Sequence, residues 1–75
     1  MTNPHHALQG AIDEDAYDWL SQHAPAYVQA ISRALQAGST PTQIRWFVQG
    51  QVGPDRVGLA LRCEQAARWL ESKAA

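Results

Sequence analysis

The chain has 75 residues, of which 45% are hydrophobic and 17% charged, and its formal net charge is −1. This composition excludes a disordered chain, and it lacks the excess of cations that is typical of DNA-binding domains. One small domain over residues 1–75 is expected, and its limited core makes a partner or self-association a reasonable expectation.

The N-terminal residues 1–10 are a weak start to the fold. Pro4 can begin a helical turn but Gly10 interrupts it, so this segment is expected to be frayed, either flexible or a single short turn. Asp13 is a candidate N-cap, and acidic residues after it suit the positive end of a helix dipole. A helix over about 13–23 is predicted, because five residues share one side at helical spacing. These are Ile12, Ala16, Trp19, Leu20 and His23.

A helix over about 25–37 and the turn that follows it form the clearest pattern. Gly38 is suited to end a helix, because it enters the left-handed region without a Cβ clash. Thr40 can cap the next helix, and Gln43 completes a capping box of the Ser/Thr-x-x-Glu/Gln type. Pro41 fits the first helical position, where its missing N–H costs nothing. The expected inner face of the helix comprises Tyr27, Val28, Ile31, Ala34 and Leu35.

Two further helices are expected, over about 41–51 and 56–72. Gly53 and Pro54 separate them, and Asp55 is well placed to cap the last helix. The expected inner faces comprise Ile44, Phe47, Val48 and Val52 in the first of these helices, and Leu59, Cys63, Ala66 and Leu70 in the second. The sequence therefore predicts an all-α, compact bundle of four short helices.

The charges divide between the two halves of the chain. Residues 1–32 carry four carboxylates and no Lys or Arg, whereas residues 33–75 carry six cations and three carboxylates. Either the acidic helix lies against the basic part of the same bundle, or it meets the Arg-rich region of a second copy in a homodimer. In the last helix, Glu64 and Arg68 stand four residues apart in the order that stabilises a helix.

Two apolar residues do not fit the predicted core. Trp46 lies two residues from both Ile44 and Val48, so it points away from the buried stripe. Leu61 lies nearly opposite the apolar line of the last helix. Either the N-terminal segment covers Trp46 and the first helix covers Leu61, or both are free to contact a partner. The candidate partner contacts are Trp46, Arg45, Gln49 and Leu61.

No catalytic or metal-binding motif is found. His5 and His6 are adjacent, so on a helix they diverge and do not converge well on one metal. Cys63 and His23 have the residue types of a nucleophile and base, but Cys63 falls on the most buried stripe. The acidic residues lack the spacing of a calcium loop, and no zinc spacing or phosphate loop occurs. We therefore expect no enzyme activity, no cofactor or metal, and no small-molecule substrate.

Neither a disulfide nor a membrane partner is expected. The single Cys63 excludes an intrachain disulfide, and no signal peptide or long apolar run is visible. No predicted helix combines a broad apolar face with a face rich in Lys and Arg, as binding at a membrane surface requires. The expected location is the cytoplasm.

Residues 30–49 resemble the helix-turn-helix signature of DNA-binding proteins, although Ser39 stands where an apolar turn residue is usual. The positions that carry the resemblance are Ala34, Gly38, Ile44 and Phe47. The resemblance implies that helix 41–51 reads base edges, with phosphate contacts from flanking arginines. The residues that would contact DNA are Thr42, Gln43, Arg45, Gln49, Arg33 and Arg56.

The sequence therefore supports two functional hypotheses. The first is a small non-enzymatic protein-interaction or regulatory module that binds a protein partner or a second copy of itself. The alternative is a small helix-turn-helix DNA-binding regulator. A domain with a net charge of −1 has few cations for phosphate contacts, which favours the first function.

Overall fold

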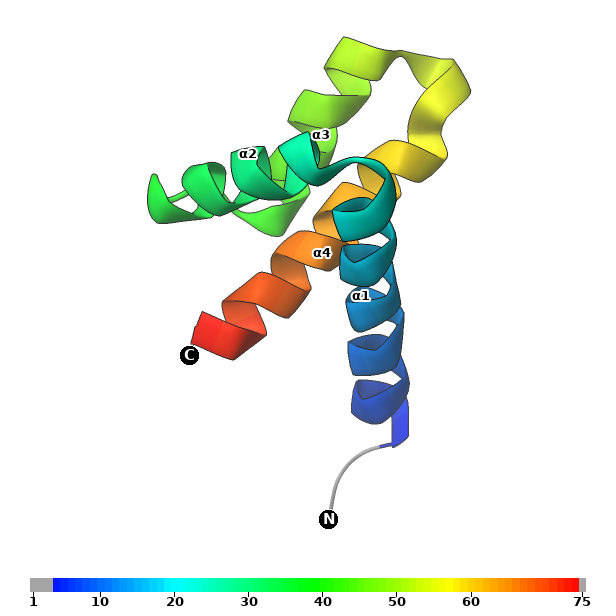
Figure 1. Ribbon diagram of the computed structural model, residues 1–75, viewed down its shortest axis with the longest axis vertical. Coiled ribbons are helices and arrows are strands. Elements are labelled where there is room, and N and C mark those ends of the chain that lie inside the picture. Colours follow the sequence, from blue (N-terminus) through cyan, green and yellow to red (C-terminus); the bar gives the residue numbers. More distant parts are fainter. Residues whose placement is uncertain (1–3, 75) are drawn as a thin grey trace.

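Four α-helices and a short 3-10 turn make up residues 4–74, which are the residues that the computed structural model describes (Figure 1). The helices are α1 (Pro4–His23), α2 (Pro25–Gln36), α3 (Pro41–Val52) and α4 (Val57–Ala74), and the turn η1 (Pro54–Arg56) precedes α4. No strand occurs within these residues. The predicted all-α class and the four packed helices are confirmed.

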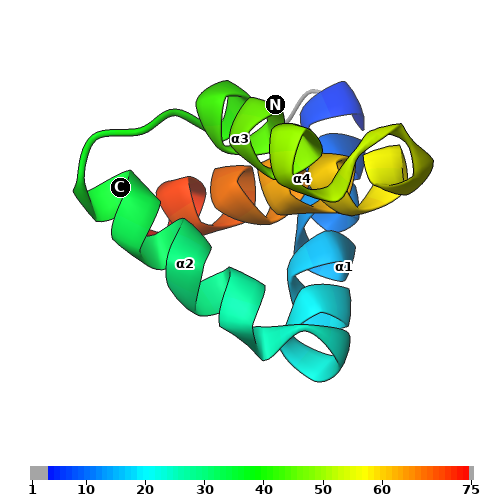
Figure 2. The ribbon, with the colours of Figure 1, turned by 90° about the horizontal axis from the view of Figure 1, so that it is seen from above.

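The last helix, α4, is the centre of the bundle. Both α1 and α3 pack extensively along α4, and α2 also contacts it, whereas α1 and α3 do not pack against each other within residues 4–74. Figure 2 shows α2 and α3 diverging from their connecting turn, with α4 running between them. The N-terminal end of α1 projects beyond the other helices (Figure 1). The bundle is therefore organised around one helix with three partners.

Small side chains on α4 allow this arrangement. Four of them are completely buried, and their size lets neighbouring helices approach the α4 backbone closely. They are Ala60, Cys63, Ala66 and Ala67. The other helices insert larger side chains: Leu20 from α1, Ile31 from α2, and Ile44 with Val48 from α3. Complete burial of Leu20 contributes about 2 kcal/mol to the stability of the fold.

The expected start of the first helix is wrong. Helix α1 already begins at Pro4 and runs through Gly10, which was expected to interrupt it. One glycine inside a helix costs only about 1 kcal/mol relative to alanine, and the packing of α1 on α4 offsets this cost. Asp13 is consequently not an N-cap: it lies within α1, is buried, and accepts a hydrogen bond from Gln9 Nε2 at 2.9 Å. Residues 1–3 of the segment expected to be frayed lie outside the described residues.

The turn between α2 and α3 is confirmed in detail. Gly38 has φ 99°, in the left-handed region. The Thr40 hydroxyl accepts a hydrogen bond from the Gln43 backbone N–H at 3.2 Å, and the Gln43 side chain accepts one from the Thr40 N–H at 2.9 Å. Pro41 is the first residue of α3. The turn differs before α4, because Asp55 lies inside η1 and α4 begins two residues later, at Val57.

Several residues assigned to inner faces are exposed. Phe47 is 67% exposed, because it lines an open groove between α2 and α3, and these two helices diverge from their turn (Figure 2). Ile12 and Trp19 are 47% and 38% exposed, because they lie on a flank of α1 that is turned away from Asp13, Ala16 and Leu20. His23, at the end of α1, is exposed as well. The helical periods were thus correct, but the buried arc of α1 and α3 is narrower than the arc of apolar residues.

Candidate binding surface on α3

Helix α3 places two aromatic side chains in solvent. Trp46 is 70% exposed and Phe47 is 67% exposed, whereas Ile44 and Val48, which lie nearly opposite Trp46, are buried. The outward direction predicted for Trp46 is confirmed, and no described residue covers it. Exposed aromatic residues are typical anchors of protein interfaces, because they bury a large area with few rotatable bonds. We call Gln43, Trp46, Phe47, Gln49 and Gly50 the α3 surface.

A hollow lies beside the Trp46 indole. It is lined by Trp46, Gln49, Gly50 and Pro54. Gly50 has no side chain and no atom within 4 Å of the position that a Cβ would occupy, so the indole stands next to open space. The predicted contacts Trp46 and Gln49 therefore border one hollow.

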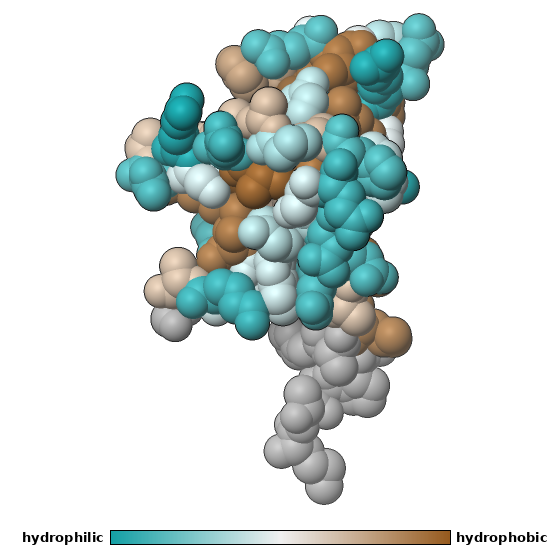
Figure 3. Space-filling model, viewed as in Figure 1, coloured by the Kyte–Doolittle hydropathy of each residue, from teal (hydrophilic) through white to brown (hydrophobic). Residues whose placement is uncertain are grey.

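A groove lies on the other side of Phe47, between α2 and α3. Its volume is about 430 Å³, and its lining comprises Ala34, Ser39, Gln43, Ile44 and Phe47. We call it the α2–α3 groove. Figure 3 shows apolar surface reaching the exterior between hydrophilic residues in the half of the molecule that contains α2 and α3. The groove therefore extends the apolar part of the α3 surface.

The groove lies where the two helices of a helix-turn-helix unit would pack against each other. The resemblance implies that Phe47 is buried against the preceding helix, but Phe47 is exposed, α2 and α3 are in little contact, and they diverge from their turn (Figure 2). The capped turn is present without close packing of the two helices. The spacing of the signature is therefore explained by the turn alone.

Arg45 is held against a buried carboxylate. Its Nη1 lies 3.9 Å from Glu64 Oε2, and Arg68 Nη2 donates a hydrogen bond to Glu64 Oε1 at 2.7 Å. Glu64 is only 5% exposed. The predicted pairing of Glu64 with Arg68 is confirmed, but the sequence analysis missed that Glu64 is buried and that Arg45 reaches it. The signal was present: Glu64 lies four residues after Ala60 and three before Ala67, on the stripe that is buried.

Leu61 lies beside the α3 surface by helical spacing. It precedes Glu64 by three residues on α4, and Glu64 contacts Arg45 across the α3–α4 seam. Leu61 is 37% exposed, so α1 does not cover it fully. The structure therefore places Arg45 at the α3–α4 seam and Gln49 beside Trp46, and it leaves Leu61 partly exposed on α4.

The residues predicted to contact DNA do not form one accessible surface. The Gln43 carbonyl is engaged in the capping box, and the Arg45 guanidinium faces Glu64. Thr42 and Arg33 are exposed, on α3 and α2. Arg56 lines a hollow with Trp19 and Arg62, on the side of α4 that faces α1. Two of the base-reading candidates are thus already paired, and the phosphate candidates do not form one cluster.

A second flank of aromatic and charged residues lies between α1 and α4. The Arg62 guanidinium stacks over the Trp19 ring at 4.1 Å, and the His23 ring lies 4.7 Å from Trp19. A hollow next to this stack is lined by Ile12, Asp15, Ala16, Trp19, Arg62 and Gln65. The stack fills the flank of α1 that the core leaves open.

No catalytic centre is assembled among the described residues. Burial raises the pKa of the Cys63 thiol from 9.0 to about 11, so this thiol is protonated and unreactive at neutral pH. His23 is at the exposed end of α1, whereas Cys63 is fully buried. Within the described residues, no three His, Cys, Asp or Glu side chains gather as a metal site would require. The side chains of His5 and His6 lie outside the described residues.

Comparisons with known proteins give no significant match to this chain. It matches no protein-family model, and no curated protein or solved structure is significantly similar to it. None of the helices in residues 4–74 has the length and hydropathy needed to cross a membrane.

Proposed function

We propose that this chain is a small, non-enzymatic protein-interaction module with a regulatory role, and that it binds its partner through the α3 surface. One observation carries the proposal: Trp46 and Phe47 are adjacent, each about two-thirds exposed, on a helix whose other side belongs to the core. Keeping two aromatic side chains in water brings no gain in stability to the isolated domain. A partner that covers them gains their burial.

The α3–α4 seam supports the same proposal. Burial of Ile44 and Val48 in the core fixes the rotation of α3, so that Trp46 points outward, and Arg45 adds a contact with Glu64 of α4 at 3.9 Å. Such preorganisation reduces the entropy lost on binding. Leu61, which is 37% exposed on α4, is a further proposed contact of the partner. An unpaired, reduced Cys63 in the core is consistent with the cytoplasmic location that we propose.

The test separates binding from folding. We expect proteins captured by the immobilised domain to be lost with the variant Trp46→Ala/Phe47→Ala and retained with Glu71→Ala, the loss of an exposed side chain at the far end of α4. If Trp46 is a hot spot, Trp46→Ala should weaken binding of the partner by at least ~2 kcal/mol, with little change in the melting temperature of the domain. Equal capture by all three proteins would refute the proposal.

DNA binding is the alternative outcome and has its own measurement. Anisotropy of a labelled duplex, titrated at about 50 and 200 mM salt, covers the range in which phosphate-driven binding collapses. We expect no binding at either salt concentration. Micromolar binding that weakens at least tenfold at the higher salt would favour the helix-turn-helix regulator instead.

A further inference from the structure

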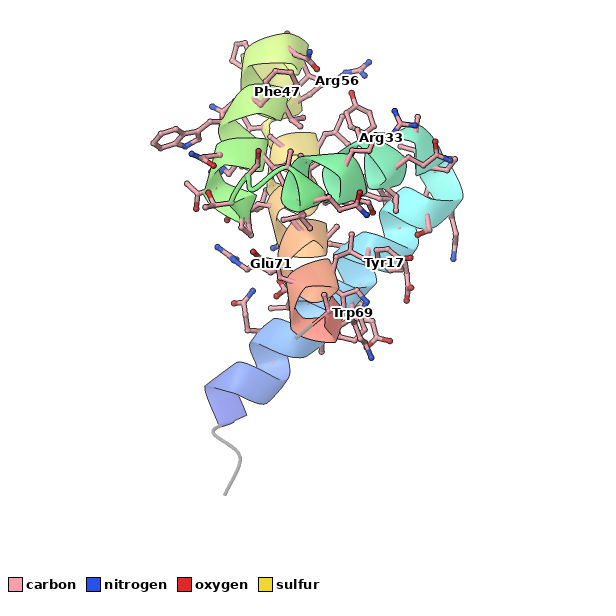
Figure 4. The ribbon with its side chains drawn as sticks, turned by 90° about the vertical axis from the view of Figure 1, so that its left-hand side faces the viewer. Tyr17, Arg33, Phe47, Arg56, Trp69 and Glu71 are labelled. Carbon is pink, nitrogen blue, oxygen red and sulfur yellow. The ribbon has the colours of Figure 1, made fainter. Side chains whose placement is uncertain are left out.

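The chemistry of the α2–α3 groove is complementary to a ligand with apolar and acidic side chains. Phe47 and Ile44 give it an apolar wall. No carboxylate occurs between Asp18 and Asp55, so neither α2, α3 nor their turn carries a negative side chain. Arg33 is exposed in the last turn of α2, and Figure 4 shows Arg33 and Phe47 on the same side of the molecule.

Helix α1 has the complementary chemistry. Leu8 is 63% exposed and Ile12 is 47% exposed, one turn apart on the same side of α1. Asp15 lies one turn further along this stripe, and Asp18 follows at its edge. No Lys or Arg occurs in residues 1–32. The exposed flank of α1 is thus an apolar stripe bordered by carboxylates.

Asp13 is buried against Gln9, and Asp15 lines the hollow beside Arg62, but no carboxylate of α1 forms an ion pair among the described residues. Among the described residues the ion pairs are those of Glu64 with Arg45 and Arg68, and neither involves α1. Helix α1 contacts α2 and α4 but not α3, and its N-terminal half runs away from the α2–α3 turn (Figures 1 and 2). Leu8 and Ile12 therefore do not reach the α2–α3 groove of the same chain. The N-terminal end of α1 also projects beyond the bundle (Figure 1). A helix α1 that enters the groove must therefore come from a second chain.

We infer that the α2–α3 groove binds α1 of a second copy of this chain. Leu8 and Ile12 of one copy cover Phe47 and Ile44 of the other, while carboxylates next to the stripe approach Arg33. With two-fold symmetry each copy gives its α1 to the groove of its partner, so the contact is made twice. This inference rests on the proposed function, because it names the occupant of the surface around Phe47.

Sedimentation velocity over a range of protein concentrations provides the test. We expect the wild type to dimerise, and we expect Leu8→Arg and Phe47→Glu each to weaken dimerisation at least tenfold. Leu8→Arg places a cation on the acidic helix, and Phe47→Glu places a carboxylate in the groove. The matched control Val57→Arg alters an exposed apolar residue outside both surfaces and should dimerise as the wild type does. Circular dichroism confirms that each variant is folded.

Mixing the two weakened variants is the decisive step. The chain with Leu8→Arg has an intact groove, and the chain with Phe47→Glu has an intact α1, so one wild-type contact forms between them. The introduced arginine and glutamate meet in the other contact. The mixture should therefore form dimers at concentrations where each variant alone is monomeric. A monomeric wild type, variants that dimerise normally, or a mixture without recovery would each overturn the inference. Capture of another protein that still depends on Trp46 would in that case leave the proposed function intact.

Discussion

Arg45 on α3 and Glu64 on α4 approach to 3.9 Å, although Gly53 and η1 separate the two helices in the chain. Glu64 is 5% exposed and also accepts a hydrogen bond from Arg68 at 2.7 Å. A buried carboxylate is tolerated only when it is paired, so both arginines offset the cost of its desolvation. This contact links α3 to α4 beside Ile44 and Val48, whose burial in the core turns Trp46 outward.

Loss of the Glu64 charge should destabilise the fold. Glu64→Gln leaves Arg45 partly buried without its carboxylate, and we expect a loss of about 1–3 kcal/mol in the free energy of unfolding by urea. Arg68→Ala is the control, because this side chain is 43% exposed and should cost less than about 1 kcal/mol. A smaller loss for Glu64→Gln than for Arg68→Ala would contradict this account of the seam.

Neighbouring residues of α3 should differ sharply in their effect on stability. Ile44 is 6% exposed, and Ile44→Ala should reduce the free energy of unfolding by about 2–5 kcal/mol. Trp46 is 70% exposed, and Trp46→Ala should change it by less than about 0.5 kcal/mol. Urea titrations of both variants measure the difference. A large loss for Trp46→Ala would assign this residue to the core.

Two glycines should respond to alanine in opposite directions. Gly38 has φ 99°, so Gly38→Ala is strained and should destabilise by about 1 kcal/mol or more. Gly10 lies inside α1 with no atom within 4 Å of its Cβ position, so Gly10→Ala should stabilise by about 0.5–1 kcal/mol. Thermal unfolding of the two variants tests the continuity of α1. No gain from Gly10→Ala would show that α1 is not helical at this position.

Cys63 should make the stability of the protein depend on alkaline pH. Burial raises its pKa from 9.0 to about 11, so the folded state retains the thiol proton over a range in which the unfolded state loses it. The contribution is complete below about pH 9 and falls as the pH rises towards 11, by up to about 3 kcal/mol.

The control for this prediction is Cys63→Ala. Urea titrations of both proteins between these pH values cancel the titration of other residues. The free energy of unfolding of the wild type should fall more steeply with pH than that of the variant. Parallel curves would show that burial does not perturb the thiol.

The sequence predicts the helices well because their ends are marked by local chemistry. Gly38, Thr40, Pro41 and Gln43 act within one turn of the chain, and the structure contains each of their predicted interactions. The continuity of α1 through Gly10 was not predictable in this way, because it depends on packing against α4, which is distant in sequence.

The candidate surface was predicted only in part. The exposure of Trp46 follows from its position opposite Ile44 and Val48, which a single helix specifies. The exposure of Phe47 does not follow, because it depends on the divergence of α2 from α3. The burial of Glu64 likewise depends on a neighbouring helix, although its stripe on α4 was visible in the sequence.

The most direct test of the central claim is a nuclear magnetic resonance titration of the indole N–H groups. The chain has three tryptophans, of which Trp46 belongs to the α3 surface, Trp19 lies under Arg62, and Trp69 lies under Lys73. When the protein concentration is raised, or a captured partner is added, the account predicts that the Trp46 signal shifts and the Trp69 signal does not. A Trp46 signal that stays unchanged under both conditions would contradict the assignment of α3 as the binding surface.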